Sequence, residues 1–490
     1  MPDNDAWDRK DEAWERAVRE ARSLSRYRKV TAFAERMFEE SAMISFPIYI
    51  GGSHVSYPIR LGGSSLRILV RLPLTDRTGF SAEKLSLEAA TADYLSRQSE
   101  LPIPKVHHHG LDLEIGPFAI MQDFGNKRDM RDFLETPRTH LNDPPVLRPD
   151  ISDERLGILY LRIARCVLQI VQPSFPVIGS LVSTTPGSCA VLGRPITANM
   201  STMVQLSNVP ESILPPTGST YQNTDDWYVV LAQMHMATLV FQHNDMVSSE
   251  DDCRCKYVAR QLFLRLAKQH RLSKFGFAED DWSDRSITSR SNLSMPPGSG
   301  SFRLWNDHFQ PGNVLVDDSD LVAGVVDWEF TYAAPTQFVL DSPWWLLLDW
   351  PERWHNGIVE WAHEYGRRLE TWLSALREAE IEMEPGSFLL STYMRDSWET
   401  GRFWLNYAAQ SSWGFDSIYW RYLDEPFFGV RDAEVPTEQL WRTRIHLLTD
   451  DEKEAMEPLV QIKMAESKER ALVDWKDDEA KQRMSSFLFD

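Results

Sequence analysis

The sequence predicts an α+β fold of two lobes, in which a small antiparallel sheet crossed by one helix precedes a large, mainly helical lobe. A chain of 490 residues exceeds the size at which one hydrophobic core usually stops growing, so two lobes are expected. Between residues 44 and 73, short β-type runs alternate with glycine pairs at 51–52 and 62–63, a pattern typical of hairpin turns. Beyond residue 125 the apolar residues fall mostly at helical spacing.

Residues 45–125 are predicted to form the smaller lobe, and residues 1–44 a helical extension before it. After the hairpin and the strand LRILVRL, the segment SAEKLSLEAATADYLSRQ predicts a helix with Ser81 as its N-cap and Glu83 in its first turn. An extended LPIPKV and the strand GPFAIMQDFG complete the lobe. In the extension, four large apolar residues are candidates for burial: Trp7, Trp14, Phe33 and Met37.

Residues 126–448 are predicted to form the helical lobe. The stretch 173–223 is rich in Pro, Ser, Thr and Gly, so we expect an inserted loop segment packed on the helices. Residues 304–335 carry polar loops between short apolar runs, and residues 449–490 have a highly charged helical pattern, which predicts a helical tail.

Composition excludes several classes of function. The formal net charge of −20 argues against nucleic-acid binding, which needs a basic stripe that neutralises phosphates. No apolar run reaches the length of a membrane span, and the charged N-terminal pattern lacks a signal-peptide core. Four cysteines are too few for a disulfide framework. We therefore expect a soluble, cytoplasmic protein that acts on a small molecule, without a nucleic-acid or membrane partner.

Polar residues crowd the ends of two short apolar runs near the middle of the helical lobe. The stretch LWNDHFQPGNVLVDD places Asp307, His308, Gln310 and Asn313 just before the run Val-Leu-Val, and GVVDWEF places Asp327 at the end of another run. Such clusters at strand ends indicate chemistry.

Several motifs in this order together resemble the aminoglycoside phosphotransferase family, and in particular its large fungal branch. They are the glycine loop IGGSHVSY, then LVRLP, EKLSLEAA, LPIPKV, FAIMQDF, NDHFQPGNVLVD and GVVDWEFTYAAP, and the likeness extends from about Ser45 to Gly429. The resemblance implies a protein-kinase-like fold, ATP and Mg²⁺ as cofactors, and phosphoryl transfer to a hydroxyl group of a small-molecule acceptor.

Phosphoryl transfer needs clamps on the nucleotide phosphates, and the small lobe offers them. Backbone N–H groups of Gly51, Gly52 and Ser53 are candidates to lie over phosphates, although the glycine pair alone also fits a plain turn. No lysine stands on the third strand. Arg71 stands there instead, with Glu88 at the matching place on the following helix; the alternative is an ordinary ion pair.

The resemblance further places a nucleotide-binding hinge in the segment IMQDF, at Gln122, Asp123 and Phe124. There, backbone groups are expected to receive the adenine ring.

The catalytic loop departs from the kinase pattern H-R-D-x-x-x-x-N. Counting back five residues from Asn313 reaches His308 instead of the catalytic aspartate, Asn306 stands at the position of the histidine, and Asp307 lies one residue early. Asn313 and Asp327 keep the two metal positions, and oxygen ligands on separate loops suit Mg²⁺. The candidate base is therefore His308, or Asp307 if the loop shifts by one residue.

Three functions remain open from the sequence. The leading one is an ATP- and Mg²⁺-dependent phosphotransferase. The others are a pseudokinase that binds nucleotide or metabolite without transfer, and a repurposed biosynthetic enzyme that uses His308 as acid or base. The intact Asn313 and Asp327 favour the first two, whereas His308 favours the last two.

The acceptor itself is not identified by the sequence. Aromatic residues in helices after residue 335 either form an acceptor wall or belong to the core, and the candidates, with one acidic neighbour, are Trp344, Trp345, Trp398, Glu399, Trp404 and Tyr419.

Overall fold

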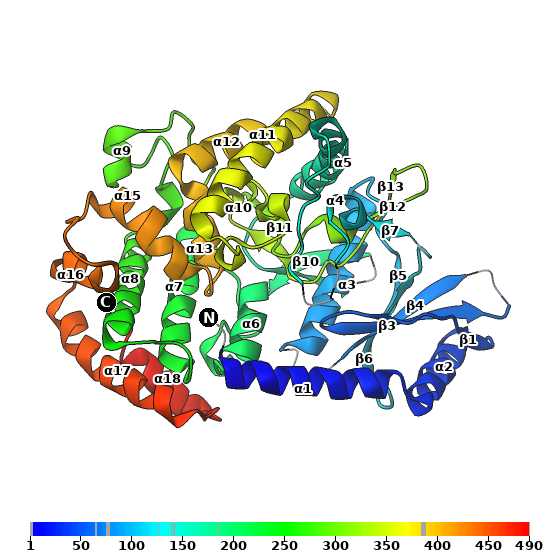
Figure 1. The fold of residues 1–490 in the computed structure, drawn as a ribbon. Coiled ribbons are helices and arrows are strands. Elements are labelled where there is room, and N and C mark those ends of the chain that lie inside the picture. The colour runs from blue at the N-terminus through cyan, green and yellow to red at the C-terminus, as the bar shows by residue number, and fades with distance from the viewer. Residues whose placement is uncertain are drawn as a thin grey trace.

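A computed structural model of the protein describes residues 3–63, 66–74, 79–125, 127–138, 140, 143–185, 187–383 and 389–489. The chain has the predicted two-lobed α+β fold, with a sheet-containing lobe beside a larger helical lobe (Figure 1). The small sheet with one helix lies beside the helical lobe, and polar loops stand between them. None of the helices within these ranges is long and apolar enough to cross a membrane.

The sheet of the small lobe is antiparallel, with strand order β1-β3-β4-β6-β5 and with β2 paired to β3. The helix α3 (Ser81–Gln98) packs against β5 and β6. Alternate residues of β4 are buried, as the two-residue period of a strand requires, whereas most residues of β3 are buried. The strands are β1 (Ala42–Ile44), β2 (Tyr49–Ile50), β3 (His54–Leu61), β4 (Arg67–Pro73), β5 (Val106–Asp112) and β6 (Gly116–Gln122).

The N-terminal extension forms two helices, α1 (Asn4–Ala21) and α2 (Leu24–Phe38). Phe33 is buried against the sheet, as predicted, and Met37 packs at the edge of the same core. The predicted burial of Trp7 and Trp14 is wrong, because 40% and 38% of these residues are exposed. Small residues fill the inward face of α1 instead, so the large indole rings lie toward solvent.

In the helical lobe, α5 (Asp153–Val171) packs along α11 (Ile358–Glu382), and α7 (Thr224–Phe241) packs along α8 (Glu250–Lys268). The charged C-terminal segment forms α17 (Asp450–Glu469), which packs against α8, and α18 (Asp477–Ser485), which contacts α7. The other helices are α4 (Arg131–Leu134), α6 (Ala198–Leu206), α9 (Asp284–Thr288), α10 (Thr336–Val339), α12 (Leu390–Thr400), α13 (Arg402–Gln410), α14 (Phe415–Ile418), α15 (Asp424–Phe428) and α16 (Trp441–Arg444).

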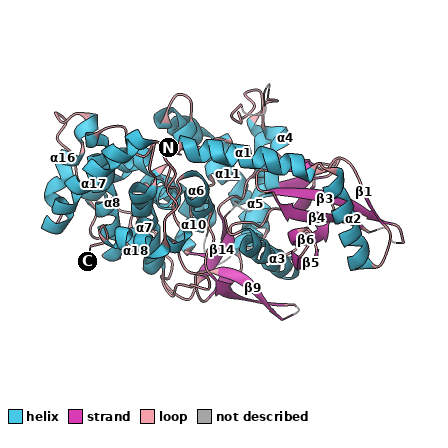
Figure 2. Cartoon of the chain, turned by 90° about the horizontal axis from the view of Figure 1, so that it is seen from below, coloured by secondary structure: helices cyan, strands magenta, loops and turns pink. Residues whose placement is uncertain are grey.

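The predicted loop segment 173–223 contains regular structure, so that expectation needs correction. It holds β8 (Ser174–Phe175), the hairpin of β9 (Ser180–Thr185) and β10 (Ser188–Gly193), and helix α6. The hairpin packs against α3 of the small lobe, as Figure 2 also shows for β9. Tertiary packing thus orders a segment whose composition favours loops.

Two small sheets present the polar loops between the lobes. In one, β11 (Phe302–Asn306) lies between β14 (Thr331–Ala334) and β8. In the other, β12 (Val314–Val316) lies between β13 (Val322–Val325) and β7 (Arg128–Asp129). Because most apolar side chains of these strands are buried in the main core, the loops that connect them are held from both ends.

Candidate active site

The loop between β11 and β12 is fixed by its own polar residues. Asn306 accepts a hydrogen bond from the His308 backbone N–H over 2.8 Å and donates to the Asp327 carbonyl over 3.2 Å. Farther along, the Gln310 N–H donates to Asn313 Oδ1 and the Asn313 N–H donates to the Gln310 carbonyl, each over 2.9 Å. These bonds join the candidate catalytic loop to the loop that carries Asp327.

Asp327 has a left-handed backbone conformation, with φ of 65°, which is uncommon for residues other than glycine. Its Oδ1 atom lies 2.8 Å from Arg71 Nη2, and its Oδ2 atom lies 3.4 Å from Asn313 Nδ2. Burial tends to raise the pKa of Asp327, but Arg71 more than offsets this and holds the pKa below its ordinary value. The carboxylate is therefore ionised at neutral pH.

Arg71, on β4, joins the two lobes. Its Nη1 atom lies 2.7 Å from Glu88 Oε1 on α3, while Nη2 contacts Asp327 of the helical lobe. Glu88 is buried, and its second oxygen has no hydrogen-bond partner among the described residues. One guanidinium therefore holds a strand, a helix and a loop of the other lobe together, as its forked geometry allows.

Three further residues of this cluster were missed by the sequence analysis. Lys84 Nζ lies 2.5 Å from Glu329 Oε1, and His54 Nδ1 lies 3.4 Å from Glu329 Oε2 and 3.2 Å from Arg71. Burial and the nearby Arg71 hold the pKa of His54 well below its usual range, so the ring is neutral. Lys84 lies four residues before Glu88 on one helix, a spacing that places both on one face and could have identified it.

Asp307 is already occupied by two donors. Trp305 Nε1 donates to its Oδ1 over 2.7 Å, and the backbone N–H of Ala198, the first residue of α6, donates to its Oδ2 over 3.0 Å. Burial raises the pKa of Asp307 to about 7. Asp307 therefore ties the segment 173–223 to the catalytic loop.

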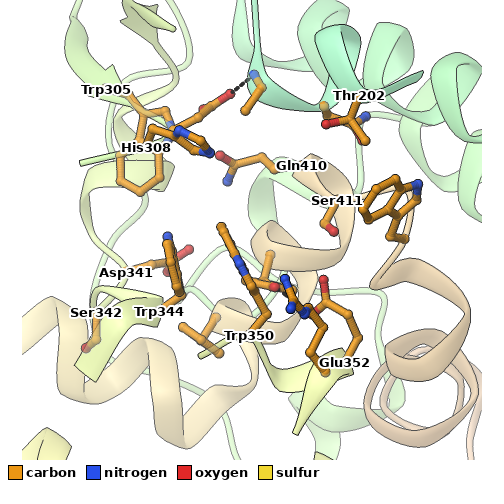
Figure 3. A pocket seen from close by; sticks show the side chains of 17 residues that line it. Thr202, Trp305, His308, Asp341, Ser342, Trp344, Trp350, Glu352, Gln410 and Ser411 are labelled. Carbon is orange, nitrogen blue, oxygen red and sulfur yellow. Dashed lines mark hydrogen bonds between the residues drawn. The ribbon is translucent and has the colours of Figure 1, made fainter. Parts of the chain in front are cut away.

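His308 lies between the loop that carries Asp327 and a neighbouring cavity. Its ring packs edge-to-face on Phe330, with 5.5 Å between ring centroids, and its backbone N–H donates to Asn306, which in turn donates to the Asp327 carbonyl. His308 also lines the cavity (Figure 3). The side chain of Asp307 already accepts hydrogen bonds from two donors. The side chain of His308, by contrast, borders both the Asp327 loop and the cavity and does not share this attachment.

The glycine turn lies at the end of the sheet where this cluster is found. Gly51, Gly52 and Ser53 connect β2 to β3, and the Gly51 N–H donates to the His54 carbonyl over 2.9 Å. A Cβ atom built on Gly52 would have nothing within 4 Å, so the backbone there is open to an approaching group.

The predicted hinge segment follows β6. The Gln122 N–H donates to the Lys105 carbonyl over 2.8 Å, and the Asp123 N–H donates to the Arg67 carbonyl over 3.1 Å. The ring of Phe124 packs on Gly324, where a Cβ atom would come within 2.9 Å of it. No hydrogen bond from the Phe124 N–H to another described residue is found.

The cavity beside His308 has a volume of about 270 Å³. Trp344 and Trp350 stack on each other, with 3.4 Å between centroids, and Figure 3 shows them across the cavity from His308 and Gln410. The full lining is Ala198, Asn199, Thr202, Trp305, Asp307, His308, Asp341, Ser342, Trp344, Trp350, Glu352, Arg353, Phe403, Tyr407, Gln410, Ser411 and Trp413. This lining combines aromatic faces with three carboxyl groups.

The carboxyl groups of the cavity have hydrogen-bond donors but no ion pair with a described residue. Asn406 donates to Asp341 over 2.7 Å and Tyr407 donates to Glu352 over 2.7 Å. Burial raises the pKa of Asp341 to about 6 and also raises the pKa of Glu352. Each carboxyl group would therefore be favoured in its charged form by a cation in the cavity.

Only part of the predicted aromatic wall lines this cavity. Trp344 does, whereas Trp345, Trp404 and Tyr419 are buried in the core, and Trp398 packs against Tyr365 and Phe403. Glu399 is not among the lining residues. The aromatic residues of the lining that the sequence analysis missed are Trp305, Trp350, Phe403, Tyr407 and Trp413. Phe403 and Tyr407 lie on α13, where helical spacing does not distinguish a cavity lining from a core, and Trp305 lies on β11.

A metal bound here could not rely on side-chain carboxylates, histidines and cysteines alone. Within the described ranges, no group of three or more such residues is placed to hold a metal ion. Asp327 and the amide of Asn313 supply two oxygen atoms, so further ligands would come from water or from phosphate.

Comparison with known proteins gives structural neighbours only. No protein-family model matches the chain, and no curated protein matches it. A macrolide 2'-phosphotransferase type I is 12% identical over 84% of this chain and 99% of its own, with a TM-score of 0.36. A thermostable mutant of aminoglycoside phosphotransferase APH(4)-Ia, in a ternary complex with ADP and hygromycin B, is 16% identical over 79% of this chain and 98% of its own, with a TM-score of 0.34.

A third neighbour is the spectinomycin phosphotransferase APH(9)-Ia in complex with ADP and spectinomycin. It is 10% identical over 91% of this chain and 98% of its own, with a TM-score of 0.33. The structural neighbours are thus aminoglycoside and macrolide phosphotransferases at low sequence identity. At these scores the likeness carries no argument about function, which depends on the contacts within this chain.

Proposed function

We propose that this protein is an ATP- and Mg²⁺-dependent phosphotransferase that acts on a hydroxyl group of a small molecule. The observation that carries the proposal is Arg71, which contacts Glu88 of the small lobe and Asp327 of the helical lobe at the same time. A cation fixed by a helix carboxylate, beside a metal-binding aspartate, is the electrostatic arrangement that phosphoryl transfer requires. The motifs that resemble the fungal branch of the aminoglycoside phosphotransferase family support assigning the protein to that branch.

The residues present fit Mg²⁺ and a nucleotide. Three carboxyl groups, of Glu88, Asp327 and Glu329, face two cations, Arg71 and Lys84. When Glu88, with a pKa of about 7, is ionised, one negative charge is left for a metal ion to balance. Asn313 Oδ1 accepts one N–H and keeps a second lone pair for a metal. When bound, Mg²⁺-ATP supplies the phosphoryl group and neutralises its developing charge.

The small lobe offers backbone donors for the rest of the nucleotide. The open turn at Gly51, Gly52 and Ser53 suits the phosphates through the N–H groups of Gly52 and Ser53, because the Gly51 N–H already donates to the His54 carbonyl. We expect the Phe124 N–H, at the end of the hinge segment with Gln122 and Asp123, to donate to the adenine ring, because it forms no hydrogen bond with another described residue.

His308 is the proposed general base. It borders both the cavity and the Asp327 region, and a neutral imidazole can accept a hydroxyl proton near pH 7. Asp307 takes a positioning role, since both its oxygens already accept hydrogen bonds from Trp305 and Ala198. This choice favours His308 over a shift of the loop register.

The cavity beside His308 is the proposed acceptor site. Its aromatic faces and its three carboxyl groups without a cationic partner suit a compound that carries a hydroxyl group, an apolar or ringed surface and a protonated amine. Binding of such a cation would lower the pKa of Asp341 from about 6, so we expect tighter binding as the pH rises through this value.

Turnover of ATP by the parent and by single variants tests the proposal. His308→Ala should lower the rate by about 10²–10⁴-fold with the Kd for ATP unchanged, because a base acts only in the transfer step. Asp307→Asn should lower the rate less, with a loss of thermal stability. If Asp307→Asn abolished turnover while His308→Ala left it intact, Asp307 would be the base.

A pseudokinase is the second candidate function. One observation favours it, because both carboxylate oxygens of Asp327 already contact side chains, those of Arg71 and Asn313, which compete with a metal. Nucleotide binding without turnover in the parent and in His308→Asp would support this candidate. An ATP-independent reaction that His308→Ala eliminates would instead support a repurposed enzyme.

A further inference from the structure

Helix α1 crosses from one lobe to the other. Both Figure 1 and Figure 2 show it running from the helical lobe to the sheet of the small lobe. Its N-terminal end is anchored by Asp3, which is fully buried and accepts hydrogen bonds of 2.9 Å from Asn244 Nδ2. Arg470 adds an ion pair with Asp5, 3.0 Å long, and another with Asp245. This end is therefore fixed to the helical lobe.

The other end of α1 belongs to the small lobe. Val18 and Ala21 are buried in the core of the sheet, and Tyr57 of β3 donates to the Ala21 carbonyl over 2.9 Å. One turn earlier, Trp14 Nε1 lies 3.4 Å from the Gly51 carbonyl of the glycine turn. A helix of 18 residues is about 27 Å long, so α1 is a rigid link between two anchored ends.

Lys10 lies halfway along the inward face of this link. The other inward positions carry short apolar side chains, namely Ala6, Ala13, Ala17, Val18 and Ala21, whereas the neighbours of Lys10 at positions 8, 9, 11 and 12 are exposed. This spacing is the helical period of a face that packs on the protein. The only long side chain on that face is thus a lysine placed between the two anchors.

Lys10 lies one helical turn before Trp14, whose indole contacts the glycine turn beside the candidate active site. Burial lowers its pKa; Asp11 acts in the opposite direction, and the positive charge of Lys84 lowers the pKa further. Lys84 itself is bound to Glu329, and Arg71 is bound to Glu88 and Asp327. By contrast, Lys10 forms no ion pair with any residue in the described part of the chain. An anion beside Lys10 would offset both the desolvation of its ammonium group and the repulsion from Lys84.

We propose that α1 is a strap between the two lobes, whose Lys10 binds a phosphate group of the nucleotide and whose Trp14 holds the glycine turn. This inference rests on the proposed function and adds a cation that neither the strand nor the helix of the small lobe supplies. Since the strap is anchored in both lobes, the position of Lys10 depends on the contact between Asp3 and Asn244 as well as on the sheet.

Calorimetric titration of the full chain with ATP, ADP and adenosine, with Mg²⁺ present for the nucleotides, tests the proposal. Lys10→Met should weaken ATP binding by about 10–100-fold, the worth of a charge-assisted hydrogen bond, and leave adenosine binding within about twofold of the parent. Arg9→Met is the matched control, because it removes the same charge from the exposed neighbouring position. It should bind both ligands as the parent does.

A second variant links the effect to the strap. Asn244→Ala removes the side-chain donor to Asp3 and keeps only the backbone donor of the same residue, so it should weaken ATP binding by loosening that end of α1. Because both changes act on the same contact, the double variant with Lys10→Met should bind ATP no more weakly than Lys10→Met alone. Additive losses would mean that the anchor does not act through Lys10.

The outcomes separate this inference from the proposed function. If the parent binds ATP and Lys10→Met binds it equally well, the strap proposal is wrong and the phosphotransferase proposal stands. Tighter ATP binding by Lys10→Met would mean that α1 obstructs the site, and would also overturn the proposal. If the folded parent binds none of the nucleotides, both proposals fail together.

Discussion

Replacing Arg71 with methionine tests how the two lobes are held at the candidate site. Glu88 is only 4% exposed, and Arg71 is its ion-pair partner at 2.7 Å. Removing one member of a buried pair leaves an uncompensated charge and costs about 3–5 kcal/mol of unfolding free energy. We therefore expect Arg71→Met to lower stability by up to that amount at about pH 8, where Glu88 is ionised in the parent.

The pH dependence gives the prediction its sign. Burial raises the pKa of Glu88 to about 7 even with Arg71 present. Because the positive charge of Arg71 lowers this pKa, its loss in Arg71→Met should raise the pKa of Glu88 further. The folded state then binds a proton that the unfolded state, with a pKa of about 4.3, has released, so stability falls as pH rises between these values. The loss caused by Arg71→Met should be larger at about pH 8 than at about pH 5.5. Glu88→Gln in the same background should remove the difference.

Urea unfolding followed by fluorescence measures these changes, with the midpoint compared at constant slope. Arg395→Met is the matched control, because the Arg395–Glu370 pair has the same 2.7 Å length but side chains that are 47% and 60% exposed. It should cost about 0–1 kcal/mol. A loss below about 1 kcal/mol for Arg71→Met, equal at both pH values, would refute the reasoning.

Three other predictions follow from the site. His308→Asp should raise ATP turnover in a coupled assay, because it restores a carboxylate at the base position; an unchanged rate with ATP bound would count against transfer. Gly324→Ala should cost about 1–3 kcal/mol in thermal unfolding, since its Cβ atom would press on Phe124, whereas Gly52→Ala, with nothing within 4 Å, should unfold like the parent. Trp350→Ala should raise the KM for an aromatic amino alcohol more than it lowers kcat, and the reverse split would place Trp350 outside the acceptor site.

The sequence allowed prediction of the contacts between elements that follow one another closely in the chain. A strand with Arg71 followed by a helix with Glu88 brings the two side chains together wherever that helix packs on that sheet, and the pair forms here. The contact between Asn313 and Asp327 was predictable for the same reason, because the two residues stand at the ends of neighbouring strands that pair with each other. Their roles in binding a metal and a nucleotide remain predictions.

The contacts that sequence analysis missed join segments far apart in the chain. Lys84 and Glu329 are separated by 245 residues, and Asp307 and the Ala198 N–H by 109. Ala198 begins a helix inside a stretch whose composition favours loops, so no local pattern marked it as a donor to Asp307. Trp14 could not be placed either, because its environment depends on how α1 lies across both lobes.

Titration of the purified protein with ATP in the presence and absence of Mg²⁺ tests the central claim most directly. The account predicts binding that requires Mg²⁺ in the parent, is lost in Asp327→Asn, and is kept in Asp318→Asn, which removes the same charge from an exposed position. All three proteins should have similar thermal stability. Normal Mg²⁺-dependent binding by a folded Asp327→Asn, or no binding by the folded parent at millimolar ATP, would contradict the account.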